Sequence, residues 1–145
     1  MPVTLVPYIA YLIALVICGL AYWQGDRPLR IAAVVLIVSW ALSPLVSNGS
    51  RTSLDYPVTI IDTNAALIFI WISTRWRRVW CAILSALTIV VTIIPIVSLI
   101  DRGIHRYNNL AANNVVAVFQ LIVMLVATGL TVRARGRADE GALQL

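Results

Sequence analysis

Apolar residues fill five long stretches of this chain, and short polar segments separate them. A helix needs about 20 consecutive apolar residues to cross a bilayer, and each stretch is close to that length. The stretches cover residues 3–23, 29–46, 58–74, 79–100 and 110–132. They predict an all-α fold: a polytopic membrane bundle of five transmembrane helices within residues 1–132, followed by a cytoplasmic tail at residues 133–145.

The connections between the stretches predict which helices are neighbours. Residues 75–78 form so short a link that the third and fourth helices should pack as an antiparallel hairpin. Residues 24–28 contain Gly and Pro and predict a compact turn between the first and second helices. Helices that follow one another in the chain should therefore lie side by side.

The composition supports a membrane protein. Hydrophobic residues make up 61% and charged residues 12% of the 145 residues. Soluble proteins usually have about 25% charged residues. The net charge of +5 comes from the loops and the tail, so it indicates contact with anionic membrane lipid and not with nucleic acid.

Arginine placement predicts the orientation, because cytoplasmic loops carry the excess of basic residues. Eight of the eleven arginines fall on one side if the five helices alternate: Arg27, Arg30, Arg75, Arg77, Arg78, Arg133, Arg135 and Arg137. The other side receives Arg51, Arg102 and Arg106, with Asp55, Asp101 and His105. We therefore expect the N-terminus outside and the C-terminus inside, with a chain that crosses the membrane several times.

Small and weakly polar residues recur at helical spacing and predict packing seams, because they let helices approach closely in lipid. The fourth stretch carries Cys81, Ser85, Thr88 and Thr92, and the first carries Ala10 and Ala14. An alternative is that the hydroxyls of the fourth stretch line a substrate path.

Asp62 is the one acidic residue inside a predicted span, and an intramembrane carboxylate is a functional candidate because its burial is costly. It could form an outward-facing polar cluster that binds a cation, a proton or a polar headgroup. The further members would be Asn64, Asp101, His105, Asn113 and Asn114. The competing interpretation is structural, with Thr59 as the N-cap of the third helix and Asp62 stabilising its first turn.

The sequence contains few features of an enzyme. His105 is the only histidine, so no multi-histidine metal site or bis-histidine haem can form within one chain. Cys18 and Cys81 fall at matched depth, but no Cys-x-x-Cys motif supports a redox pair. Because nucleophile elbows, phosphate loops and paired carboxylates are also lacking, we expect a protein that is not an enzyme and needs no metal or cofactor.

Three short segments within this five-span pattern carry a resemblance: residues 61–62, 75–80 and 99–101. In them the chain resembles small uncharacterised five-span membrane proteins of alphaproteobacterial type. The resemblance covers most of the chain and implies a bacterial inner membrane, but it supplies no activity and no site residues.

We expect an accessory or assembly subunit of a larger membrane complex, whose partners are membrane lipids and either other integral membrane proteins or further copies of itself. The alternative is a small oligomeric carrier or channel that uses the polar cluster around Asp62. A holin-like pore and an intramembrane enzyme that acts on a lipid or quinone are lesser alternatives.

Overall fold

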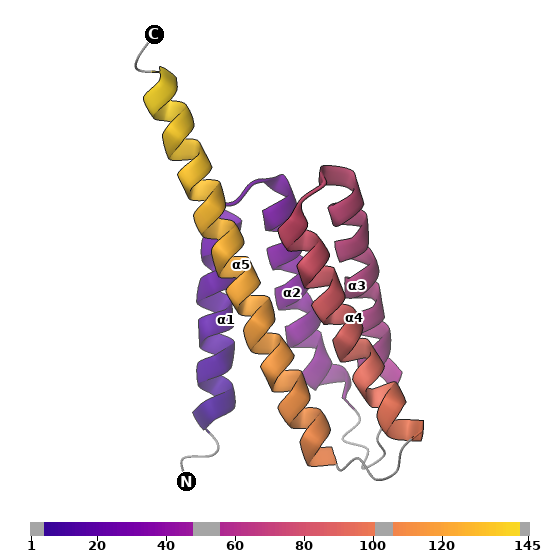
Figure 1. The fold of residues 1–145 in the computed structure, drawn as a ribbon. Helices are drawn as coiled ribbons and strands as arrows, with labels where there is room; N and C mark the ends of the chain where they lie inside the picture. The colour runs from indigo at the N-terminus through magenta and orange to yellow at the C-terminus, as the bar shows by residue number, and fades with distance from the viewer. Residues whose placement is uncertain (1–4, 48–55, 101–105, 143–145) are drawn as a thin grey trace.

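The structure is a computed structural model that describes residues 5–47, 56–100 and 106–142. Within these ranges the chain forms five helices joined by short connections (Figure 1). They are α1 (Leu5–Gln24), α2 (Arg27–Val46), α3 (Tyr56–Trp76), α4 (Val79–Ile100) and α5 (Arg106–Ala142). The expected all-α fold is confirmed.

Four of these helices are long and apolar enough to cross a membrane, judged on the described residues. The qualifying segments are Arg27–Val46, Tyr56–Trp76, Val79–Val97 and Ala111–Asp139. The first helix contributes a shorter apolar segment, Tyr8–Gln24. The lengths therefore support a membrane protein with at least four candidate spans, and the fifth span stays a prediction.

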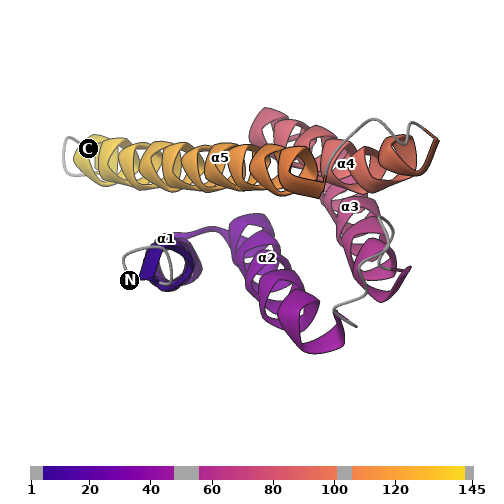
Figure 2. The same ribbon diagram turned by 90° about the horizontal axis from the view of Figure 1, so that it is seen from below.

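The helices pack in chain order, and the last closes on the first. Each helix contacts the next, α5 also contacts α1, and α2 and α5 touch more weakly across the ring. Figure 2 shows this arrangement from below. The expected hairpin of α3 and α4 is confirmed, and these two helices share the most extensive contact.

Local sequence explains where two helices begin and end. Pro28 lies in the first turn of α2, where its missing N–H and restricted backbone are tolerated. After α3, Arg77 adopts a left-handed backbone with φ 49°, the conformation that commonly terminates a helix. At both connections the chain reverses within two residues.

The core of the ring uses small side chains to bring the helices together. Several large residues, such as Phe69, Leu84 and Met124, fill the remaining space and are fully buried. The small buried residues are Ala14, Cys18, Ala21, Ala32, Ala33, Ala65, Ala66, Cys81 and Ala127. The outward faces instead expose many Leu, Ile, Val and Phe side chains, such as Leu12, Ile83 and Phe119, a surface suited to lipid rather than water.

The predicted seam residues occupy several levels of this core. In α4, Cys81, Ser85 and Thr88 are buried and Thr92 is half-buried. In α1, Ala14 is buried, but Ala10 is exposed and does not belong to the seam. From Ala14 onward, the buried face of α1 continues through Cys18 and Ala21.

The segment predicted as a tail continues α5 without a break. This helix is 37 residues long and extends beyond the turns that end the other helices (Figure 1). From Val132 to Asp139 every residue is exposed. Residues 133–142 are therefore a projecting helix.

Candidate functional site

Asp62 lies in the second turn of α3 and does not stabilise its N-terminus. The helix begins at Tyr56, so Thr59 is inside it and cannot be the N-cap. No acidic residue occupies the first turn. The capping interpretation is therefore wrong, and the cause is that the chain becomes helical earlier than the polar Thr59 suggests.

The face of α3 that carries Asp62 is the one that packs into the bundle. Asp62 itself is half-buried, and one or two turns further along the same face lie Ala65, Ala66 and Phe69, all buried. Within the described residues, the side chain of Asp62 makes no hydrogen bond and no ion pair. It is therefore a carboxyl group on an inward-facing stripe whose charge is not balanced by a described partner.

The described members of the predicted polar cluster do not assemble around Asp62. Asn64 is exposed and donates from Nδ2 to the carbonyl of Ile60, one turn earlier, at 2.9 Å. Asn113 and Asn114 are exposed on α5. Asp101 and His105 lie outside the described residues. Among the described members, no hydrogen bond or ion pair joins one to another.

A buried amide that sequence analysis missed links two helices instead. Gln120 of α5 is 4% exposed, and its Nε2 donates to Thr88 Oγ1 of α4 at 3.1 Å. Thr88 in turn donates to the carbonyl of Leu84 at 2.8 Å. Gln120 is the only amide deep in the fifth apolar stretch, and that isolation is the signal that could have identified it.

Asp62 of α3 and Thr92 of α4 lie at one depth in the bundle. At a helical rise of about 1.5 Å per residue, Asp62 and Thr92 each lie roughly 20 Å along their helices from the α3–α4 turn. Thr92 donates to the carbonyl of Thr88 at 3.0 Å. Thr88 and Thr92 are thus satisfied along their own helix, and Thr88 also accepts the bond that Gln120 donates from α5.

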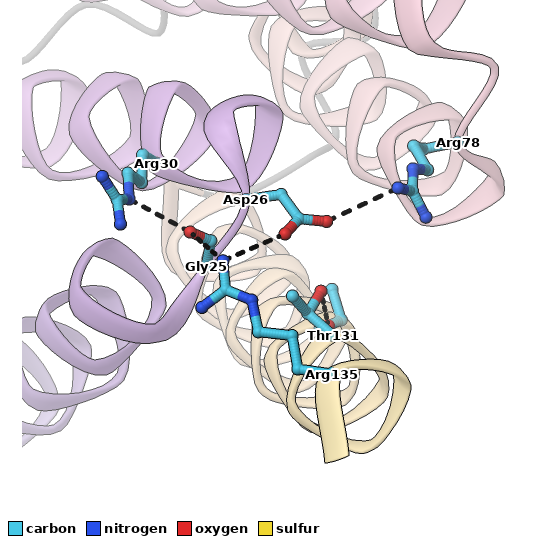
Figure 3. Close-up of polar contacts among 7 residues, drawn as sticks. Gly25, Asp26, Arg30, Arg78, Thr131 and Arg135 are labelled. Atoms are coloured by element: carbon cyan, nitrogen blue, oxygen red, sulfur yellow. Dashed lines mark hydrogen bonds and ion pairs between the residues drawn. The ribbon is translucent and has the colours of Figure 1, made fainter. Parts of the chain in front are cut away.

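A second polar cluster lies at the opposite end of the bundle and centres on Asp26 (Figure 3). Asp26 precedes α2 in an extended conformation, with φ −70° and ψ 169°, and its side chain does not cap the helix. Its two carboxylate oxygens instead accept from Arg78 Nη2 at 3.4 Å and Arg135 Nη2 at 3.3 Å. One acid therefore connects the α1–α2 turn, the α3–α4 turn and the projecting part of α5.

Gly25 adds a backbone acceptor to this Asp26 cluster. Its carbonyl accepts from Arg30 Nε at 3.0 Å and from Arg135 Nη2 at 3.5 Å. A Cβ atom at this position would collide with the carbonyl oxygen of Ala21, so only glycine fits. The turn and the two arginines thus depend on one small residue.

The Asp26 cluster connects three parts of the chain through ion pairs that are individually weak. The side chains of Arg78 and Arg135 are 52% and 53% exposed and that of Asp26 is 35% exposed, so each pair should contribute only about 0–1 kcal/mol. Sequence analysis used Arg78 and Arg135 only as markers of topology. It missed Asp26, which it treated as part of a turn.

The remaining predicted topology residues gather at the same end of the molecule. Arg75 lies 5.8 Å from the ring centroid of Trp76, and Arg77, Arg133 and Arg137 are exposed. Arg75 lies in the last turn of α3 and Arg77 in the α3–α4 turn, while Arg133 and Arg137 belong to the projecting part of α5. This clustering matches the expected grouping of basic residues and makes this end strongly cationic.

The described residues with metal-binding or thiol side chains are dispersed or buried. They contain no group of three or more His, Cys, Asp or Glu that could hold a metal ion. Cys18 and Cys81 are free and buried, and Cys81 Sγ donates weakly to the carbonyl of Phe69 at 3.5 Å. Both cysteines therefore fit the role of small buried residues.

No protein-family model, curated protein or solved structure matches this chain. The resemblance to small alphaproteobacterial membrane proteins therefore stays a prediction from sequence. The function has to be argued from the geometry of the chain itself.

Proposed function

We propose that this chain is a non-enzymatic integral protein of a bacterial inner membrane and acts as an accessory or assembly subunit of a larger membrane complex. The projecting part of α5, residues 133–142, would lie on the cytoplasmic side and contact a partner. The observation that carries the proposal is the length of α5 together with its exposed end.

Helix geometry supports this role for α5. Its 37 residues extend about 55 Å at 1.5 Å per residue, whereas the hydrocarbon core of a bilayer is about 30 Å thick. The part beyond the bundle is rich in arginine and is exposed as far as Asp139, and its Arg135 contacts Gly25 and Asp26 of the α1–α2 turn. A rigid, charged projection of this kind is suited to docking on an acidic partner surface.

The test is purification of the natively expressed, tagged chain in mild detergent, followed by native mass determination and mass spectrometry of the bound proteins. We expect a stoichiometric complex with other membrane proteins. The double variant Arg133→Gln/Arg137→Gln should reduce partner recovery at least tenfold, because it removes two exposed charges that make no described ion pair.

A matched control lies at the other end of the same helix. The double variant Asn113→Ala/Asn114→Ala changes two exposed polar residues and should leave partner recovery unchanged. A homogeneous monomer or homo-oligomer with no other protein attached would contradict the subunit proposal.

The half-buried carboxyl of Asp62, which has no ion-pair partner in the described part of the chain, favours a second candidate, a small oligomeric carrier or channel. In this case the purified chain alone, reconstituted in liposomes, should transport protons or a small cation. Asp62→Asn should abolish the flux without loss of helicity, whereas Asp139→Asn, at an exposed position, should retain it. Absence of flux from the unchanged protein would contradict this candidate.

A further inference from the structure

A shallow groove lies where α1 ends and α2 begins, on the cationic end of the bundle. It has a volume of about 370 Å³, and its lining is formed by Gly19, Tyr22, Trp23 and Arg30. The groove is open to the outside and combines one basic side chain with two aromatic rings. It is separate from Asp62 but adjoins the Asp26 cluster, because Arg30 and Arg135 donate to the same carbonyl of Gly25.

Arg30 is held in place with its terminal donors unused. Its Nε donates to the carbonyl of Gly25 at 3.0 Å, and its Cζ lies 6.0 Å from the ring centroid of Tyr22. Within the described residues, Arg30 forms no ion pair with an acid, and its two terminal nitrogens donate no hydrogen bond. The guanidinium is thus oriented in advance and still able to donate two bonds to one anion.

The apolar part of the groove continues onto the outer surface of α1. Trp23 is 82% exposed, and a Cβ atom at Gly19 would meet nothing within 4 Å. Farther along the helix, Leu15 and Val16 are exposed. An exposed tryptophan beside a fixed arginine, at the end of an apolar helix, is the arrangement found at the headgroup level of a membrane.

We propose that this groove binds the headgroup of an anionic phospholipid. The terminal nitrogens of Arg30 would donate to the phosphodiester oxygens, and the rings of Tyr22 and Trp23 would pack against the glycerol and the first methylene groups. The acyl chains would follow the exposed face of α1 past Gly19. The charge fits the phosphate and the adjoining apolar surface fits the chains, so a lipid suits this groove better than a free phosphate ion does.

The experiment is native mass spectrometry of the full chain in detergent, titrated with phosphatidylglycerol or with phosphatidylcholine. We expect the first phosphatidylglycerol to bind at least tenfold more tightly than phosphatidylcholine. Arg30→Gln should remove this preference. Arg27→Gln is the matched control, because Arg27 is exposed on the same turn but does not line the groove, and the preference should survive.

Three outcomes would overturn the proposal: equal binding of the two lipids, an unchanged preference in Arg30→Gln, or an equal loss in Arg27→Gln, which would indicate a diffuse charge effect. Displacement of the lipid by millimolar inorganic phosphate would overturn the choice of a lipid. If Arg30→Gln does not fold, Gly19→Leu tests the site instead, because its side chain fills the groove while Arg30 is retained. Binding must then fall at least tenfold, and unchanged binding refutes the site.

Discussion

The residue on which the Asp26 end of the molecule depends most is Gly25. It is buried, and its carbonyl accepts from two arginines that come from different elements. An added Cβ atom would meet the backbone of Ala21 as well as the side chain of Leu29. Since backbone cannot yield as a flexible side chain does, a substitution here must shift the whole turn.

Gly25→Ala should therefore lower the free energy of unfolding by about 1–3 kcal/mol, the usual cost of overpacking. The measurement is reversible unfolding in mixed detergent micelles, followed by circular dichroism. Gly129→Ala is the control, because a Cβ atom there meets nothing within 4 Å. In mid-helix that change should stabilise by about 0.5–1 kcal/mol. Equal effects of the two substitutions would contradict the steric argument.

At the scale of helices, the contact of α4 with α5 combines close packing with one polar bond. Gln120 and Thr88 are both buried and bond to each other at 3.1 Å. Bonds of this type between membrane helices average about 0.6 kcal/mol and reach about 1.7 kcal/mol. The helix pair is thus stabilised mainly by packing, while the bond fixes the depth at which one helix meets the other.

A double-mutant cycle of Thr88→Val and Gln120→Leu tests this bond. We expect a coupling energy of about 0.5–1.5 kcal/mol in detergent unfolding, because each single variant removes the same interaction. Thr128→Val is the control, since Thr128 is buried but bonds only to the carbonyl of Met124 on its own helix. Its coupling with Thr88→Val should be close to zero. A zero coupling for Gln120 with Thr88 would show that the bond contributes nothing.

At the scale of the whole molecule, the Asp26 cluster joins α5 to two turns that are distant in the sequence. Asp26→Asn weakens both the contact with Arg78 and the contact with Arg135. The projecting part of α5 should therefore become more accessible to protease. Limited trypsin digestion should cleave it several times faster than in the unchanged protein. The same increase should follow from raising the salt concentration, because the ion pairs are partly exposed and are screened. Asp139→Asn, which affects no described ion pair, should leave the rate unchanged.

Much of the fold was predictable from hydrophobic pattern alone. The fourth stretch was expected at residues 79–100, and α4 is Val79–Ile100. The helical structure of residues 133–142 was not predicted. No proline ends the fifth apolar stretch, and these residues continue α5. The Asp26 cluster could not be predicted, since its partners lie 52 and 109 residues away and meet only through tertiary packing. Gln120, by contrast, stood out in an apolar stretch and was overlooked.

Whether α1 crosses the membrane decides how the whole molecule is oriented. In the structure, α1 begins at the end of the bundle opposite to that at which α5 ends (Figure 1). Five spans would place the two termini on opposite sides of the membrane, whereas four would place them on the same side.

Cysteine labelling of intact cells distinguishes these topologies. The background is Cys18→Ser/Cys81→Ser, which removes the only two thiols of the chain. In this background we expect Thr4→Cys to react with a membrane-impermeant maleimide, because the arginine distribution places the N-terminus outside. Gly136→Cys, at an exposed position of α5, should react only after permeabilisation. Labelling of both positions, or of neither, would indicate an even number of spans with α1 lying in the interface, and the reverse pattern would invert the orientation. If the expected pattern is found, residues 133–142 face the cytoplasm, and a partner of α5 should be sought there.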